Sequence, residues 1–462
     1  MNASNEEEEN QQNSEQDILF EIGGEILYQR PTSKIPSKEQ ESLENIRIRF
    51  GTLLKTETVS FLLGAGASVA CGGQLIGSVP LAVERDLHDK GIAGSDQVHR
   101  WLNIFYIAAY QSSYNSSIPF TRNNILSRHE ELIKDCVQPL PVNFEQVLAT
   151  LHRWRAALPK TGGRLRIEGK PGLDAKLEDL DACIYHATSA LAQTCNLPTQ
   201  EKRDGLTAYR TFLRKILTRP LNLKRVNIFT LNYDTLVEQA ADAEGVVLLD
   251  GFVGTQKRVF RPESYEQDLY FPAETTEGRV HRFDRVLHLY KLHGSITWES
   301  TESTIDNPYG IICNHYISDG TKKPLLIYPT PAKYGESLGM PYGELFRRFA
   351  SAIVRPQSVL FVIGYGFGDE HVNAIIRQAL AVPSFTLVII DPKPKSDFVT
   401  KLREQNDRRI WIAEGKSIGT FEGFVQLALP DLRDEEIQKQ IYDTLRALTK
   451  NSPQDGEDSN GN

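Results

Sequence analysis

Residues 58–68 read Thr-Val-Ser-Phe-Leu-Leu-Gly-Ala-Gly-Ala-Ser, and this stretch decides the expected fold. Its first six residues are mostly β-branched or apolar, as in a strand that is buried on both faces of a parallel sheet. The small residues Gly64, Ala65, Gly66 and Ser68 then occupy the turn where such a strand leads into a helix that faces a nucleotide. Their backbone N–H groups can approach a pyrophosphate because no bulky side chain is in the way. A tight packing turn would use the same residues, so both interpretations stay open.

Short apolar runs repeat this pattern later in the chain. Further strands are expected at Val226–Thr230, Val286–Leu292, Leu325–Tyr328, Val359–Ile363, Phe385–Ile390 and Ile410–Ala413. These runs are apolar throughout and do not alternate, which indicates strands covered by helices on both faces. We therefore expect an α/β fold, a Rossmann-like parallel sheet flanked by helices.

Long amphipathic segments occupy the rest of the domain. A helix is expected at Ser37–Lys55, before the first strand. From about residue 81 to residue 219 the sequence has helical periodicity, for example at Asn143–Leu158 and Leu177–Cys195, and no strand is expected. This stretch is predicted to be a large helical insertion in a domain of residues 31–432.

The two ends of the sequence are polar. Residues 1–30 are acidic and rich in Asn and Gln, and residues 451–462 are rich in Asp, Asn, Ser and Gly, so both are predicted to be disordered tails. A charged helix is expected at 433–450. The N-terminus lacks the basic and apolar regions of a signal peptide, and no apolar run approaches the roughly 20 residues that cross a bilayer. We expect no contact with a membrane.

The composition is that of an ordinary globular protein, with 40% hydrophobic residues among 462. The formal net charge of -8 does not indicate direct binding to nucleic acid. The five cysteines never fall in a Cys-x-x-Cys spacing, which indicates neither a disulfide framework nor a zinc site. We therefore expect a cytoplasmic protein without a bound metal.

Two polar motifs follow predicted strands directly, at the edge where open α/β sheets bind their ligands. In Thr230-Leu231-Asn232-Tyr233-Asp234, Asn232 could hold a ribose hydroxyl or a water beside Thr230, and Asp234 could cap the next helix or bond the ligand. In Lys291-Leu292-His293-Gly294-Ser295, His293 is a candidate general base because histidine titrates near neutrality, and Gly294 would let a substrate come close. A core histidine with satisfied hydrogen bonds is the structural alternative.

A third predicted strand end carries Gly364-Tyr365-Gly366-Phe367-Gly368-Asp369-Glu370-His371. Its glycines leave room for a sugar or phosphate, which makes Gly364 and Gly366 candidate binding residues. Asp369 is expected to be a helix N-cap. Asp391 ends another strand, where its carboxylate could accept hydrogen bonds from an adenosine ribose or mark a turn.

In this order the motifs resemble those of the sirtuin-like family, and in particular its bacterial branch of NAD-cleaving enzymes that act in antiphage defence. The resemblance runs from about Val59 to Leu432. It implies a sirtuin-like Rossmann domain with NAD as its substrate and no metal. By this resemblance Asn232 and His293 would be the catalytic residues. The pyrophosphate and ribose would lie along Gly64, Ala65, Gly66 and Ser68, and the adenosine beside Gly364 and Gly366.

Two departures from the deacylating members of that family bear on the activity. Those members carry a four-cysteine zinc module, which this sequence lacks, and a Pro-Asp-Phe-Arg segment where this chain has Val69-Ala70-Cys71-Gly72-Gly73-Gln74. With water as the acceptor, the resemblance implies an NAD glycohydrolase that releases nicotinamide and ADP-ribose. The alternatives are a non-catalytic regulatory module that binds NAD or ADP-ribose, and a protein ADP-ribosyltransferase or deacylase.

The resemblance also implies regulation, because unrestrained cleavage would drain the NAD of the host cell. Members of the family are controlled by assembly or by a partner. We therefore expect a homo-oligomer, a separately encoded HerA-like ATPase as partner, and a role as an antiphage effector that depletes cellular NAD.

Overall fold

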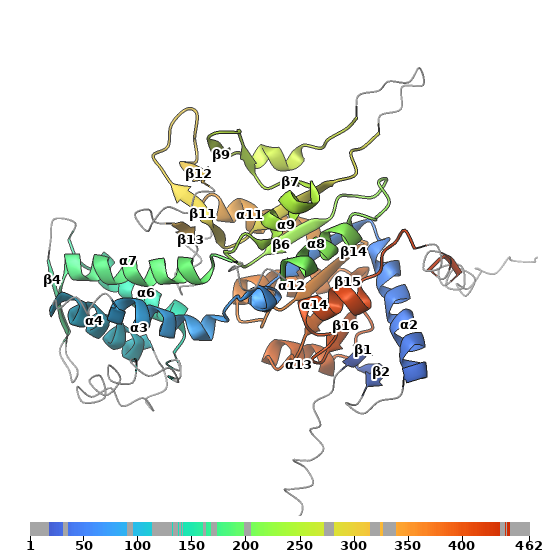
Figure 1. Ribbon diagram of the computed structural model, residues 1–462, viewed down its shortest axis with the longest axis horizontal. Coiled ribbons are helices and arrows are strands. Elements are labelled where there is room, and N and C mark those ends of the chain that lie inside the picture. The colour runs from blue at the N-terminus through green and yellow to red at the C-terminus, as the bar shows by residue number, and fades with distance from the viewer. Residues whose placement is uncertain are drawn as a thin grey trace, which may run out of the picture.

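The computed structural model describes most of the chain (Figure 1). The described residues are 18–30, 36–89, 96–112, 132, 137, 140, 142–159, 163–167, 173–197, 205–271, 281–314, 324–326, 339–434, 439 and 441–443.

A nine-stranded sheet forms the centre of the described part. Its strands from β16 to β7 are parallel to one another, and β1 and β2 form an antiparallel hairpin at one edge. In spatial order the strands are β2 (Glu25–Arg30), β1 (Ile18–Ile22), β16 (Ile410–Glu414), β15 (Phe385–Asp391), β14 (Ser358–Ile363), β3 (Thr58–Leu63), β6 (Asn227–Thr230), β10 (Val286–Lys291) and β7 (Val247–Leu249). The predicted α/β class with a parallel sheet is confirmed.

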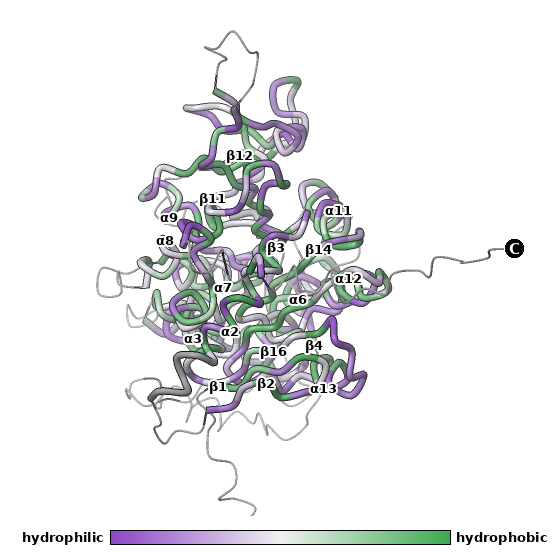
Figure 2. The backbone as a smooth tube through the Cα atoms, turned by 90° about the vertical axis from the view of Figure 1, so that its right-hand side faces the viewer, coloured by the Kyte–Doolittle hydropathy of each residue, from purple (hydrophilic) through white to green (hydrophobic). Residues whose placement is uncertain are grey.

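Both faces of this sheet are covered, as the uniformly apolar strands predict. All residues of β3 and β14 are buried, and successive residues of β3 enter opposite cores: Phe61 packs in one and Leu62 in the other. Hydrophobic residues run through these central strands in Figure 2. One face carries α2 (Pro36–Leu54), α8 (Gly205–Ile216), α9 (Leu236–Glu244), α14 (Phe421–Gly423) and the π-helix η5 (Phe424–Ala428). The other carries α11 (Tyr342–Ile353), α12 (Glu370–Leu380) and α13 (Asp397–Glu404).

A second, antiparallel sheet includes β11, which follows β10 directly in the chain. Its order is β13 (Pro324–Leu326), β11 (Gly294–Ser300), β12 (Ile311–Cys313), β9 (Arg258–Phe260) and β8 (Phe252–Val253), with the 3-10 helix η4 (Pro262–Glu266) after β9. The strand predicted at Leu325–Tyr328 therefore belongs to this sheet as far as Leu326, and residues 327–328 lie outside the described part. The parallel sheet was the wrong place for it, because an apolar run alone does not specify its partner strand.

The predicted insertion forms a separate helical unit, at the left of Figure 1. It has a hydrophobic core of its own, built by α3 (Val79–Asp89), α4 (Asp96–Ser112), α6 (Phe144–Ala156) and α7 (Leu177–Thr194), with the 3-10 turn η2 (Ile76–Ser78) leading in. Two details differ from the prediction. A hairpin of β4 (Arg164–Ile167) and β5 (Leu173–Lys176) interrupts the helices, and α8 packs in the core of the main sheet, so this unit ends before Gly205.

The ends of the chain also differ in part from the prediction. Residues 18–30 are β1 and β2 and not a disordered tail, because pairing with β16 buries Ile18, Leu19 and Phe20. Residues 1–17 and 451–462 lie outside the described residues, as does most of the predicted helix at 433–450, of which 439 and 441–443 are helical.

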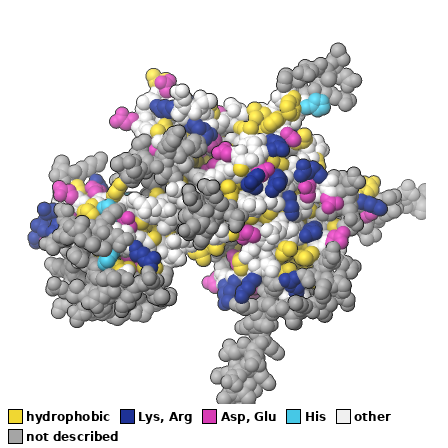
Figure 3. Space-filling view, viewed as in Figure 1, with side chains coloured by type: hydrophobic (Ala, Val, Ile, Leu, Met, Phe, Trp, Pro, Cys, Tyr) yellow, Lys and Arg dark blue, Asp and Glu magenta, His cyan; other side chains and the backbone are white. Residues whose placement is uncertain are grey.

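The surface drawn in Figure 3 has acidic and basic side chains interspersed. Among the described helices, none has the length and apolar character needed to span a membrane.

Candidate active site

The register of the parallel strands brings the predicted motifs to one edge of the sheet. Leu63, at the end of β3, pairs with Thr230 of β6, which in turn pairs with Lys291 of β10. Asn232 and His293 each lie two residues beyond these paired positions, on neighbouring strands. The sheet therefore places Asn232 and His293 at equivalent positions beyond two neighbouring strands, at the edge where α/β folds bind ligands.

The chain changes direction across the sheet between β3 and β14, and two glycine turns meet there. The Gly66 N–H donates to the Gly364 carbonyl oxygen at 2.9 Å. A Cβ on Gly64 would lie 2.5 Å from that oxygen, and one on Gly66 would lie 2.7 Å from the Gly364 Cα. Gly364 also has a φ of +62°, which disfavours other residues. These three glycines thus permit close packing of the two turns, the structural interpretation left open from the sequence.

Other small residues at this junction face open space. A Cβ on Gly366 or Gly368 would meet no atom within 4 Å, and both residues are exposed, as is Ala65. The turn after β3 continues as the 3-10 helix η1 (Ala65–Cys71) and not as an α-helix. Room for a ligand therefore lies along Ala65 and Gly366, on the exposed side of the packed glycines.

Hydrogen bonds hold the amide of Asn232 in one orientation. Its Nδ2 donates to the Gly64 carbonyl oxygen and to Ser68 Oγ, each at 2.9 Å. A carbonyl oxygen only accepts, so the nitrogen of the amide must face Gly64. Both amide hydrogens are then used, and Oδ1 remains as the acceptor that Asn232 can offer to a water or a hydroxyl. Thr230 supports the turn, since its Oγ1 accepts the Asn232 N–H at 3.0 Å.

Ser68 links Asn232 to a buried carboxylate. The Ser68 hydroxyl donates to Asp234 Oδ2 at 2.7 Å, and the Tyr209 hydroxyl lies 3.3 Å from Ser68 Oγ. Burial raises the pKa of Tyr209 well above its usual value, so the phenol keeps its proton and can donate. Asp234 Oδ1 accepts the N–H of Leu236, the first residue of α9, although the N-cap position itself is held by Thr235. Ser68 and Asp234 thus also orient Asn232, and their predicted contact with a ligand stays a prediction.

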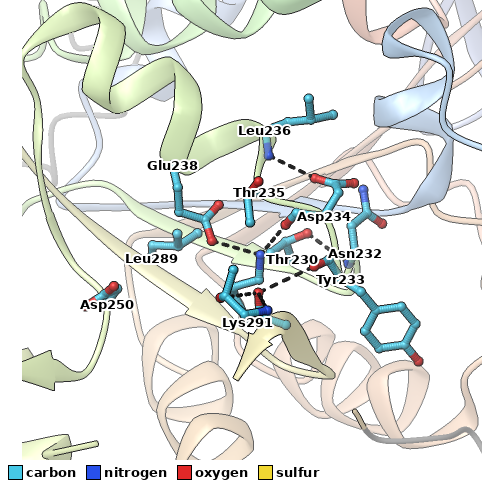
Figure 4. Close-up of polar contacts among 12 residues, drawn as sticks. Thr230, Asn232, Tyr233, Asp234, Thr235, Leu236, Glu238, Asp250, Leu289 and Lys291 are labelled. Carbon is cyan, nitrogen blue, oxygen red and sulfur yellow. Dashed lines mark hydrogen bonds and ion pairs between the residues drawn. The ribbon is translucent and has the colours of Figure 1, made fainter. Parts of the chain in front are cut away.

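A buried lysine, Lys291, also stabilises the turn that follows β6 (Figure 4). Lys291, 3% exposed, donates from Nζ to the backbone carbonyl oxygen of Asp234 and, at 2.9 Å, to Glu238 Oε1 on α9. Burial raises the pKa of the Glu238 carboxyl, and the charge of Lys291 opposes that rise. This ion pair was missed from the sequence. The sequence did contain a signal for it. Lys291 is an ionisable residue at the end of an otherwise apolar predicted strand, where a buried lysine needs an anionic partner.

His293 lies in the turn between β10 and β11 and is 7% exposed. Its Nε2 lies 3.1 Å from Oδ2 of Asp369, whose other oxygen caps α12. The predicted N-cap role of Asp369 is confirmed. Its contact with His293 was not predicted from the sequence. Gly294 is buried with a φ of +90°, so it permits the turn into β11.

Asp391 ends β15, two strands away from β3. Its Oδ1 accepts the Lys393 N–H at 2.7 Å, which supports the turn interpretation. Burial raises the pKa of this carboxyl, with the nearby Glu414 adding to the rise. The structure thus places Asp391 on the same sheet edge, where β14 and β3 separate its strand from β6, which precedes Asn232.

Comparison with known proteins finds a family match for part of the chain. Residues 226–416 match the family model of the SIR2-like domain. This part of the chain is SIR2-like. No curated protein matches the chain. A solved structure of a Sir2 homologue, a point mutant in complex with ADP-ribose, aligns over 88% of this chain and 98% of its own, at 10% identity and a TM-score of 0.29.

The SIR2-like domain, as matched, contains Asn232, His293, the turn after β14 and Asp391. The glycine turn after β3 precedes the match and joins it through the Gly66 to Gly364 contact. The helical unit joins it as well: Tyr233 and Ile296, close in sequence to Asn232 and His293, pack in the core of that unit. The described residues include no group of three or more potential metal ligands.

Proposed function

We propose that the SIR2-like domain of this chain binds NAD and hydrolyses it to nicotinamide and ADP-ribose. In this reaction the bond between ribose C1′ and the nicotinamide nitrogen breaks, and its electron pair leaves with nicotinamide. A bond from C1′ to the oxygen of a water forms, and the water gives up one proton. The ribose carries positive charge in the transition state, which fixed dipoles can stabilise.

The observation that carries this proposal is the placement of Asn232 and His293 at matching positions beyond neighbouring strands. Asn232 has both amide hydrogens engaged, so its Oδ1 is the group that would orient the attacking water or a ribose hydroxyl. His293 would accept the proton of that group. A module that only binds NAD has no need of this pair.

The two turns that meet at the β3 and β14 ends supply the place for the dinucleotide. NAD would lie along Ala65 and Gly366, where side chains leave open space. Asp391 would lie toward the adenosine ribose, since it stands farther along the same edge. The N–H groups of Gly64, Gly66 and Ala67 donate to backbone carbonyl oxygens, so the pyrophosphate would lie beside the Ala65 N–H.

The biological role that we propose is depletion of NAD in antiphage defence. Such an enzyme must stay inactive until it is needed, so we propose control by homo-oligomer formation and by a HerA-like ATPase. The helical unit is the element suited to transmit that control, because its core includes Tyr233 and Ile296 beside the candidate catalytic residues.

The test is release of nicotinamide from NAD by the purified protein, alone and with a HerA-like ATPase, measured by chromatography. Asn232→Ala and His293→Ala should each lower the rate by about 10²–10⁴-fold. Asn227→Ala and His288→Ala are matched controls, because they lie earlier on the same strands, away from the ligand-binding edge. Both controls should retain release per folded molecule. NAD binding without release under every condition would support the regulatory module instead.

A further inference from the structure

The two oxygens of the Asp369 carboxylate have different partners. Oδ1 accepts the N–H of His371 at 3.0 Å and that of Val372 at 3.5 Å, at the first turn of α12. Oδ2 lies 3.1 Å from Nε2 of His293, which comes from the β10–β11 turn. One side chain therefore caps a helix and contacts the candidate catalytic imidazole.

The surroundings keep this carboxylate in place. The Tyr365 hydroxyl accepts the Asp369 N–H at 2.9 Å and lies 3.2 Å from Asn373 Oδ1 on α12. The side chains of His293 and Asp369 are 8% and 9% exposed, so little water competes for their contact. Hydrogen bonds to a charged group are strong when they are shielded in this way.

The chemistry of the pair determines which ring nitrogen carries the proton. An ionised carboxylate only accepts hydrogen bonds, so Nε2 of a neutral His293 must be the protonated nitrogen, and Nδ1 then has the lone pair. We propose that Asp369 is a positioning residue that selects this tautomer and makes Nδ1 the proton acceptor of the reaction. This inference rests on the proposed hydrolysis of NAD for its effect on rate, but the tautomer itself does not depend on that activity.

Asp369→Asn separates the two roles of the side chain. Asparagine is as good an N-cap as aspartate, and its Oδ1 can keep the bonds to His371 and Val372. Its Nδ2 then faces His293 and donates to Nε2, which moves the ring proton to Nδ1. The substitution thus preserves the helix cap and removes the lone pair from the nitrogen that accepts the proton.

The experiment is nitrogen NMR of protein labelled with ¹⁵N-histidine, in which long-range couplings distinguish the two tautomers, combined with nicotinamide release. The His293 signals are assigned by their loss in His293→Gln. We expect the Nε2–H tautomer in the wild type and the Nδ1–H tautomer in Asp369→Asn. We also expect kcat to fall by about 10²–10⁴-fold while KM stays within about threefold.

Two further variants distinguish the loss of the contact with His293 from the loss of a helix cap. Asp369→Ser keeps a capping oxygen but cannot reach His293, and should also lose kcat. Ser396 caps α13, since its Oγ accepts the Val399 N–H. Ser396→Ala removes this cap and should leave kcat unchanged. The same tautomer in wild type and Asp369→Asn, or full kcat in Asp369→Asn, would overturn the proposal. If the wild type releases no nicotinamide, the proposed function fails, and the tautomers alone decide the role of Asp369.

Discussion

The contact between the two glycine turns predicts different outcomes for two neighbouring substitutions, Gly364→Ala and Gly366→Ala. At Gly364 the new Cβ would lie 2.5 Å from the Ala67 nitrogen and 2.6 Å from the Gly66 carbonyl carbon, and both are backbone atoms. The backbone there also has a φ of +62°. At Gly366 a Cβ would meet nothing within 4 Å, and φ is not positive.

The expected change in the free energy of unfolding follows from the backbone conformation and from the space around each glycine. A left-handed conformation costs a residue with a Cβ about 1–2 kcal/mol. Overpacking against atoms that cannot move aside costs about 1–3 kcal/mol more. Gly364→Ala should therefore lower the free energy of unfolding by about 2–5 kcal/mol. Gly366→Ala should change it by no more than about 0.5 kcal/mol.

Equilibrium urea unfolding of the three proteins measures this difference, and nicotinamide release from NAD adds a second readout. If NAD lies along Gly366, the added methyl group should raise KM although stability is unchanged. A Gly364→Ala protein as stable as the wild type would refute the packing role assigned to the turns. Equal losses in both variants would refute it as well, because open space surrounds only one of the two positions.

Three other substitutions test single contacts. Lys291→Met leaves the buried Glu238 carboxyl without its cation and should cost about 3–5 kcal/mol near pH 8. The loss should be smaller near pH 5, because burial raises the pKa of Glu238 and the carboxyl takes up a proton more readily once the lysine is gone; urea unfolding at both pH values checks this. Arg219→Lys removes a guanidinium that bonds three backbone carbonyl oxygens at 2.6 Å, so thermal unfolding should show a loss of about 2–4 kcal/mol without a change in kcat. Ser68→Ala frees one hydrogen of the Asn232 amide and should lower kcat at least about tenfold, with about 1–2 kcal/mol of stability lost.

The regular elements near the site could be predicted from the sequence because their signals are local. The strand at Thr58–Leu63 has the expected bounds, and β6, β10, β14, β15 and β16 each differ from the prediction by one residue at one end. An apolar run between turn residues is sufficient for such strands. The same reasoning missed β1, because its apolar residues stand in an acidic context and its partner β16 is far away in the sequence.

The contacts within the site could be predicted only in part. The motifs identified Asn232 and His293, and the parallel register then explains why they are neighbours. The pairing of His293 with Asp369 spans 76 residues, and no local pattern specifies it. The glycines were interpreted as space for a phosphate, but at Gly364 the space is filled by another turn. Sequence shows where side chains are small, and only the packed structure shows what approaches them.

The hairpin at the sheet edge has a consequence for how the protein is made. Strand β1 is synthesised before the parallel strands, yet it pairs with β16, about 390 residues later in the sequence. At about 5–20 residues per second, ribosomes need about 20–80 s to produce that partner. During this time Ile18, Leu19 and Phe20, which are buried in the finished sheet, have no β16 to cover them. The hairpin can therefore join the parallel sheet only after nearly all of the described chain has been made, and until then α2, which packs on Phe20 through Phe50, is the early partner of β1.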